Sequence, residues 1–192
     1  MTLRETIITE RLDGPGALRA AREFRLIYAE AFTEPPYDET EDDVDAAFRR
    51  FPVLTRKPGF RAVLARAGSG VPIGMAYGHV LGPDAVWWDE LTEPVPGDMR
   101  REDGHRTFGL LELAVRGPWR GRGVARRLHT ALLDGLRVER VLLNVNPASG
   151  TASAVYRKWG YRKVGEARPG GAGAELHHVM LFDRKGAGTL PE

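Results

Sequence analysis

One glycine-containing turn has the pattern of an anion-binding site. The segment Trp119-Arg120-Gly121-Arg122-Gly123-Val124-Ala125 links a predicted strand to a predicted helix. Glycines at such a turn let consecutive backbone N–H groups approach an anion at the positive end of the helix. Arginines crowd into the same stretch: Arg116, Arg120, Arg122, Arg126 and Arg127. The pattern predicts a phosphate-binding turn, and the alternative is a tight turn that carries solvated arginines.

Two common phosphate-binding motifs do not fit this turn. A Walker loop requires Gly-Lys-Ser/Thr after four spacer residues, and the chain contains no such sequence. A dinucleotide fingerprint requires Gly or Ala where Arg126 stands and an acid at the end of the next strand, where Asn144 stands. If this turn binds phosphate, it therefore follows another motif.

Arg120-x-x-Gly123-x-Ala125 resembles the Arg/Gln-x-x-Gly-x-Gly/Ala signature of the GCN5-related N-acetyltransferase (GNAT) superfamily, which binds the pyrophosphate of acetyl-coenzyme A. The segments Val145–Tyr156 and Lys158–Tyr161 resemble the second motif of that family, Val-x-x-x-Asn-x-x-Ala-x-x-Leu-Tyr-x-x-x-Gly-Phe. Ser149 stands where the family usually has Asn. The specific resemblance covers residues 108–166.

The resemblance implies acetyl-coenzyme A as co-substrate, with no metal. In the family the fourth strand exposes backbone groups to the pantetheine arm, and an N–H near Val115 would stabilise the oxyanion. His177 and His178 are adjacent on a predicted strand and face opposite sides, so they form no metal pair. The resemblance assigns these residues to acetyl-coenzyme A: Leu113, Ala114, Val115, Arg120, Gly121, Arg122, Gly123, Val124, Ala125, Asn146 and Ser149.

In such enzymes a neutral amine attacks the thioester directly, so the protein orients the reactants and supplies a proton to the leaving thiolate. By resemblance Tyr156 is this proton donor, and the alternative is a core tyrosine bonded to backbone. Glu112 lies on the fourth strand, where some members place the carboxylate that accepts the proton of the amine. Its alternative role is an ordinary ion pair with a neighbouring arginine.

The acceptor side is expected on the first two helices, which form the acceptor wall in the family. Between Leu26 and Phe48 the chain has eight acids and no Lys or Arg. Such a wall would attract a cationic amine, and the alternative is a solvated helix start that is enriched in acids. The candidate acceptor-binding residues are Tyr28, Glu30, Phe32, Tyr37, Trp87 and Trp88, the two tryptophans lying on a long loop expected to close over the acceptor.

The elements that must position these residues follow from apolar periodicity and turn residues. Thr40 and Asp43 resemble a capping box at the start of the second helix. Strands are predicted at Thr6–Glu10, Phe60–Arg66, Pro72–Leu81, Phe108–Arg116, Arg140–Val145, Tyr161–Glu166 and Glu175–Asp183. Helices are predicted at Ala17–Phe32, after Thr40, at Arg122–Leu136 and at Ser149–Trp159, with a structureless loop at Gly82–Arg106. The resemblance implies a GNAT-like α/β (α+β) fold, with a mixed, splayed sheet of about six to seven strands flanked by about four helices.

The length of 192 residues predicts a single domain over 1–192, with a cofactor-binding core at 108–166, acceptor-side helices at 14–52 and a frayed tail at 185–192. The chain has no cysteine, which excludes a cysteinyl intermediate. A net charge of +2 disfavours nucleic acid as a partner. The absence of a long apolar run predicts no membrane contact and a cytoplasmic protein. The sequence does not decide whether the chain forms a homodimer through its last strands.

These patterns favour an acetyl-coenzyme A-dependent N-acetyltransferase that acts on the primary amine of a small molecule. Protein N-terminal acetyltransferases of the family often carry Leu-Glu-Val on the fifth strand, where this chain has Leu143-Asn144-Val145. That departure disfavours a ribosomal-protein N-acetyltransferase, whereas a protein N-terminal or lysine acetyltransferase stays an alternative. A non-catalytic acyl-coenzyme A sensor would keep the turn but would not need Tyr156.

Overall fold

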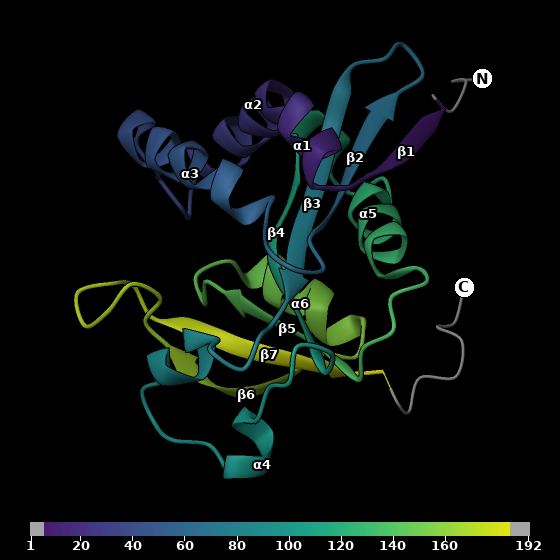
Figure 1. Cartoon of the computed structure of the whole chain (residues 1–192). Coiled ribbons are helices and arrows are strands. Elements are labelled where there is room, and N and C mark those ends of the chain that lie inside the picture. The colour runs from purple at the N-terminus through teal and green to yellow at the C-terminus, as the bar shows by residue number, and fades with distance from the viewer. Residues whose placement is uncertain (1–5, 185–192) are drawn as a thin grey trace. The chain divides into compact units, whose positions relative to one another are not determined.

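The computed structural model describes residues 6–184, and Figure 1 labels the elements. The predicted frayed tail at 185–192 lies outside the described residues. The strands are β1 (Ile7–Leu12), β2 (Arg61–Ala67), β3 (Pro72–Val80), β4 (Thr107–Val115), β5 (Arg140–Val145), β6 (Arg162–Ala167) and β7 (His177–Asp183). The helices are α1 (Gly14–Arg19), α2 (Ala21–Phe32), α3 (Glu41–Leu54), α4 (Gly97–Arg100), α5 (Val124–Leu133) and α6 (Gly150–Lys158), with short 3-10 helices η1 (Val86–Glu90) and η2 (Gly117–Trp119).

The strands form a sheet in the order β1-β2-β3-β4-β5-β7-β6. Strand β4 pairs with β5 in parallel, whereas the pairs β1–β2, β2–β3, β5–β7 and β6–β7 are antiparallel. This arrangement confirms the mixed sheet, and the longer helices α2, α3, α5 and α6 confirm the expected number of flanking helices.

The chain forms two compact units, each built from two segments. The first comprises Met1–His79 and Leu111–Leu136, and the second comprises Val80–Leu110 and Arg137–Glu192. Strand β4 contributes its N-terminal half to the second unit and its C-terminal half to the first. The single domain expected from the length stays a prediction.

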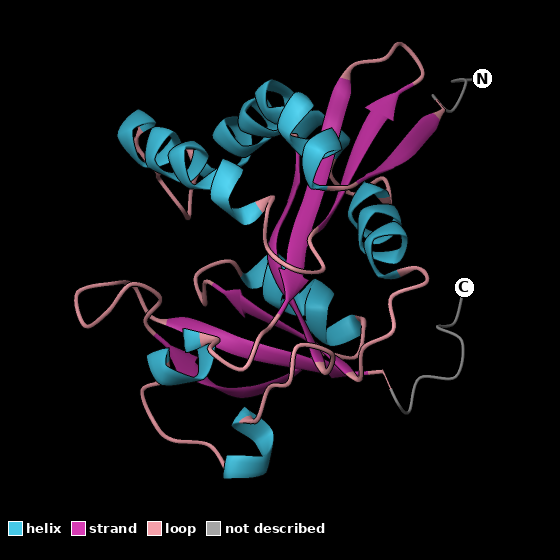
Figure 2. Cartoon of the chain, viewed as in Figure 1, coloured by secondary structure: helices cyan, strands magenta, loops and turns pink. Residues whose placement is uncertain are grey.

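In the first unit, helices α1, α2 and α3 lie beside the strands β2 and β3 (Figures 1 and 2). Their apolar faces meet in one core that includes Phe24, Phe51 and Met75, each at most 1% exposed. The predicted capping box is confirmed, because the Thr40 N–H donates to Asp43 Oδ2 (2.9 Å) and the Asp43 N–H donates to Thr40 Oγ1 (3.2 Å). The cap sets where α3 begins and therefore which of its residues face α2.

The predicted first helix is wrong at its start and at its middle. Asp13 caps a short helix through the N–H of Gly16 (2.8 Å), and Pro15 occupies its first turn, so α1 begins at Gly14 rather than Ala17. The helical run is then interrupted at Ala20 before α2 begins. Asp-Gly-Pro was a readable helix start, since Pro is favoured in a first turn.

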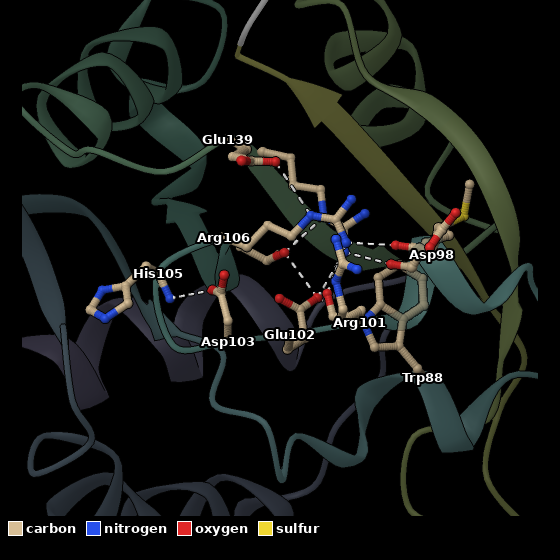
Figure 3. A network of polar contacts seen from close by, with 11 residues as sticks. Trp88, Asp98, Arg101, Glu102, Asp103, His105, Arg106 and Glu139 are labelled. Carbon is tan, nitrogen blue, oxygen red and sulfur yellow. Dashed lines mark hydrogen bonds and ion pairs between the residues drawn. The ribbon is translucent and has the colours of Figure 1, made fainter.

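The segment predicted as a structureless loop, Gly82–Arg106, contains η1 and α4. Both are held in the second unit by a buried network around Glu102 (Figure 3). Glu102 Oε1 accepts from Trp88 Nε1 (2.8 Å), Thr107 Oγ1 (2.9 Å) and Arg140 Nη2 (2.9 Å). Arg140 also donates to the carbonyl of Met99 (2.5 Å), and its guanidinium lies 5.2 Å from the Trp88 ring centroid. Tertiary contacts therefore order this segment where local sequence did not predict structure.

No helix among residues 6–184 is long and apolar enough to cross a membrane.

The buried network predicts a large effect of removing its cation. The side chains of Arg140 and Glu102 are 6% and 2% exposed, so Arg140→Met would leave a carboxylate buried without its counter-charge. We expect the free energy of unfolding, measured by urea titration, to fall by about 3–5 kcal/mol. The double variant Arg140→Met/Glu102→Met should recover most of this loss.

The matched control is Arg162→Met in the same unit, because Arg162 and Asp183 form an exposed pair. Exposed pairs contribute about 1 kcal/mol or less. An Arg140→Met variant no less stable than Arg162→Met would contradict the role given to the network.

Candidate active site

The glycine turn lies in the first unit, between the end of β4 and the start of α5. Gly121 and Gly123 have φ of 73° and 80°, backbone angles that residues other than glycine rarely adopt. A Cβ at either position would meet nothing within 4 Å, so backbone conformation and not crowding requires glycine. No side chain caps α5, whose first backbone bond runs from the Arg127 N–H to the Gly123 carbonyl (3.1 Å). The exposed turn and uncapped helix start fit a pyrophosphate.

The arginines before and within the turn are already engaged by protein groups. Arg116 donates to both oxygens of Glu30 (2.6 and 2.8 Å) and to the Pro72 carbonyl (2.9 Å). Arg120 donates to Glu34 (2.9 Å) and to the Val115 carbonyl (2.9 Å). The guanidinium of Arg122 lies 5.2 Å from the Trp119 ring centroid. Backbone N–H groups are therefore the better candidates for phosphate contacts than these side chains.

Most acids of the run between Leu26 and Phe48 have partners within the first unit. Besides Glu30 and Glu34, Glu41 and Asp45 both pair with Arg25, and Asp43 belongs to the capping box. Glu30 is thus fixed by Arg116 and does not present a free carboxylate. The acidic run is for the most part structural.

Glu39 and Glu112 differ from these acids, because neither forms an ion pair among residues 6–184. Tyr28 donates to Glu39 Oε1 (3.0 Å), whereas Glu39 Oε2 is buried without a hydrogen-bond partner among residues 6–184. Within the same residues Glu112 makes no ion pair, which leaves the arginine alternative without support. Loss of hydration and then the charge of Glu39 raise the pKa of Glu112 to about 8, and the Arg50 charge opposes this. A carboxylate with such a pKa can accept a proton near neutral pH.

In the second unit, Tyr156 lies on α6. Its ring packs edge-on against Trp159 and Tyr161, with centroids 5.7 and 5.4 Å away. Asn146 is 8% exposed, donates to Glu175 (3.1 Å) and accepts from the Ala148 N–H (2.9 Å). These side chains shape the turn before α6.

Ser149 stands at the N-cap of α6, but its side chain makes no capping hydrogen bond. The cap that serine could have provided is therefore not formed. The predicted pantetheine contacts of Asn146 and Ser149 stay predictions, as do the roles of Leu113, Ala114 and Val115 on β4.

The two tryptophans of the long loop have structural contacts in the second unit. Trp88 is 4% exposed and belongs to the Glu102 network (Figure 3). Trp87 donates to Asn144 Oδ1 (3.0 Å) and packs against the core that contains Leu142. The predicted role of both tryptophans in binding the acetyl acceptor stays a prediction.

Among residues 6–184, no group of three or more histidines and acids is placed to hold a metal ion.

Comparisons with known proteins decide the family. A family model described as the acetyltransferase (GNAT) family matches residues 21–161. The chain belongs to this family. It is a GNAT N-acetyltransferase, and acetyl-coenzyme A is the acetyl donor of the family.

Solved structures share the GNAT fold at low sequence identity. The chain is similar to a PaiA N-acetyltransferase from Thermoplasma acidophilum in complex with coenzyme A (TM-score 0.63, 10% identity, 93% of this chain and 99% of that chain). It is also similar to an acetyltransferase from Thermus thermophilus (0.60, 19%, 93% and 97%) and to the ribosomal-protein-S18-alanine N-acetyltransferase from Escherichia coli (0.62, 16%, 95% and 97%). A search of curated proteins found no match.

Sequence reasoning missed Glu39 and Tyr77. Glu39 is one acid among eight, and only the hydrogen bond from Tyr28 separates it from its neighbours. Tyr77 was readable as a residue of the inward face of β3, but its position beside Glu112 depends on the pairing of distant strands. A tyrosine alternating with Ile73 and Met75 was the available signal.

The turn makes a prediction about acetyl-coenzyme A. Gly123→Glu adds a carboxylate and bulk where phosphate is expected, so it should abolish the rise in melting temperature that acetyl-coenzyme A causes by binding the folded state. Gly135→Glu is the matched control, since Gly135 also has positive φ (65°) and open space around it, at the other end of α5. It should retain the shift. Equal shifts in both folded variants would remove the turn from the binding site.

Glu112 makes a prediction about stability and pH. The folded protein keeps this proton up to pH of about 8, whereas the reference pKa is 4.5. The folded state therefore binds more protons between these values, and stability falls as the pH rises through this window. Glu112→Gln should be more stable than wild type by an amount that grows from pH 4.5 to 8 and then levels off, as urea titrations would show.

Asp42→Asn is the control, because Asp42 is exposed and makes no side-chain hydrogen bond or ion pair among the described residues. It should show no such pH-dependent gain. A constant difference between Glu112→Gln and wild type across this range would mean that the carboxyl has an ordinary pKa.

Proposed function

We propose that this GNAT enzyme transfers the acetyl group of acetyl-coenzyme A to the primary amine of a small molecule. The observation that carries the proposal is Glu112, a carboxylate on β4 without an ion pair among the described residues and with a pKa of about 8. It lies within the electrostatic influence of Tyr28 on α2 and Tyr77 on β3, and the charge of Glu39, between α2 and α3, raises its pKa.

Bound acetyl-coenzyme A supplies the acetyl group as a thioester and leaves as a thiol. Glu112 accepts a proton from the protonated amine, which frees the nitrogen lone pair for attack. The nitrogen–carbon bond forms, the carbon–sulfur bond breaks, and, as the family resemblance implies, Tyr156 gives its phenolic proton to the sulfur. The nitrogen then loses its second proton, which returns to the Tyr156 phenolate. A phenol is a suitable acid here, because its ordinary pKa is near 10.

A small acceptor is favoured over a protein N-terminus by the fifth strand. Asn144 stands where protein N-terminal acetyltransferases of the family often carry a glutamate, and its side chain accepts a hydrogen bond from Trp87. An amide that is held in this way supplies no base. The base in this proposal is therefore Glu112 on β4.

The test is a panel of primary amines assayed for coenzyme A release, followed by Tyr156→Phe with the best acceptor. Loss of the hydroxyl should lower turnover by about a hundredfold, the effect of losing a general acid, while acetyl-coenzyme A binding persists. Tyr161→Phe is the matched control, because Tyr161 packs on Tyr156 but is 3% exposed in the core. It should turn over close to wild type.

Two outcomes would count against the proposal. Unchanged turnover in Tyr156→Phe would make Tyr156 a packing residue. If acetyl-coenzyme A binds but no amine of the panel causes release of coenzyme A, a sensor would be favoured over an enzyme for small amines.

A further inference from the structure

Four polar side chains of the first unit, here called the Glu39 cluster, come together from distant parts of the sequence: Tyr28 on α2, Glu39 before α3, Tyr77 on β3 and Glu112 on β4. Of the two Glu39 oxygens, Oε1 accepts from the Tyr28 hydroxyl (3.0 Å). Oε2 is buried and has no partner among residues 6–184. Leaving a buried acceptor unpaired costs about 1–3 kcal/mol, so this oxygen points to a missing donor.

Tyr77 is a second, independent sign of a ligand. It is 4% exposed, and its hydroxyl has no hydrogen-bond partner in the described part of the chain. Its ring is enclosed by Phe51 and Phe60, with centroids 5.2 and 6.2 Å away. The hydroxyl lies within the electrostatic influence of Glu112, Tyr28 and Glu39, and therefore points into the cluster.

The charges of the cluster favour a cation. Glu39 and Glu112 face it from the α2–α3 connection and from β4, Asp43 adds negative charge from α3, and Arg50 on α3 is the opposing cation. Burial raises the pKa of Glu39, with the charge of Asp43 acting in the same direction. The pKa values of both glutamates are thus raised, and a bound cation would favour their ionised forms.

Aromatic rings continue from the cluster. The Phe32 ring lies 4.5 Å from Tyr28 and 4.9 Å from Tyr37, and Phe48 lies 5.6 Å from Tyr28, all between centroids. Aromatic faces attract cations and also bind apolar chains. A ligand that suits both features has an ammonium group on a hydrocarbon chain.

We propose that Glu39, with Tyr28 and Tyr77, binds the ammonium group of the acceptor and makes the enzyme selective for alkylammonium compounds over neutral ones. The inference rests on the proposed function and names its substrate class. An N–H of the ammonium donates to Glu39 Oε2, and another donates to the Tyr77 oxygen. One N–H bond then breaks, its proton moves to the Glu112 carboxylate, and the neutral amine keeps the electron pair for attack.

The test measures binding of hexylamine and of the neutral analogue 1-hexanol by calorimetry, without acetyl-coenzyme A. Wild type should bind hexylamine in preference to hexanol. Glu39→Gln preserves size and can still accept from Tyr28, but it removes the charge, so hexylamine affinity should fall about ten- to a hundredfold. Asp42→Asn, an exposed acid three residues away, is the matched control and should bind as wild type does.

Melting temperature separates a binding role from a structural one. Glu39→Gln removes a partly buried charge with an unpaired oxygen, so the melting temperature of this variant should be no lower than that of wild type. If Glu39 had a structural role, its substitution would lower the melting temperature. Tyr77→Phe removes the unpaired hydroxyl and should likewise stay stable while it weakens hexylamine binding. This second variant keeps the test decisive if Glu39→Gln does not fold.

Unchanged hexylamine binding in Glu39→Gln, or no preference for hexylamine in wild type, would overturn the inference. The acetyl-coenzyme A melting shift is measured alongside. If acetyl-coenzyme A raises the melting temperature of wild type but hexylamine does not bind, this inference alone is overturned. If acetyl-coenzyme A causes no such rise in wild type, the proposed function is overturned, and hexylamine binding still tests the cation site.

Discussion

The two-bond contact between Arg116 and Glu30 organises the candidate site in the first unit. Arg116 follows the last residue of β4, where the family resemblance places the pantetheine arm, and Glu30 lies on α2, on the expected acceptor side. A planar guanidinium with two parallel bonds to a carboxylate fixes orientation as well as distance. A third bond, to the Pro72 carbonyl, adds the start of β3. Arg120 donates one hydrogen bond to Glu34, two residues after the end of α2, so a second ion pair joins the glycine turn to this part of the first unit.

This contact also explains why the acidic run could not be interpreted from sequence alone. Glu30 and Arg116 are 86 positions apart, and so are Glu34 and Arg120. No local pattern distinguishes an acid with a distant arginine partner from one that faces a ligand. Once these acids, those paired with Arg25 and the capping-box Asp43 are set aside, Asp38, Glu39 and Asp42 remain. Of these three, Glu39 alone has a buried oxygen without a hydrogen-bond partner among residues 6–184, and aromatic rings surround its partner Tyr28. The acidic run as a whole suggested a site that attracts cations. The structure narrows the candidates for this role to the carboxylate of Glu39, whose charge acts on Glu112.

The parts of the fold that sequence predicted are those that local rules control. Apolar spacing placed α3, and the Thr40–Asp43 box marked its start, because both depend on residues within two turns. The turn at Gly121 and Gly123 was predictable because positive φ favours glycine. The order in Gly82–Arg106 was not, since it depends on the pair Glu102 and Arg140, which are 38 positions apart and buried together. The motif residues were found by resemblance, whereas Glu39 and Tyr77 required the tertiary structure.

The distribution of unsatisfied polar groups separates stability from function in the first unit. In a protein selected only for stability, Glu39 Oε2 would be paired or Glu39 would be replaced. The nearby acids Glu30, Glu34 and Glu41 are all paired with arginines. Instead the carboxylates of Glu39 and Glu112 lie close enough for the charge of one to raise the pKa of the other. Two carboxylates this close are unfavourable without a counter-charge, and a cation between them would relieve the repulsion. The bidentate pair of Arg116 with Glu30 fixes α2 against the end of β4, and these two elements carry Tyr28 and Glu112 of the Glu39 cluster. A rigid ion pair therefore holds the elements that position the incompletely paired acids.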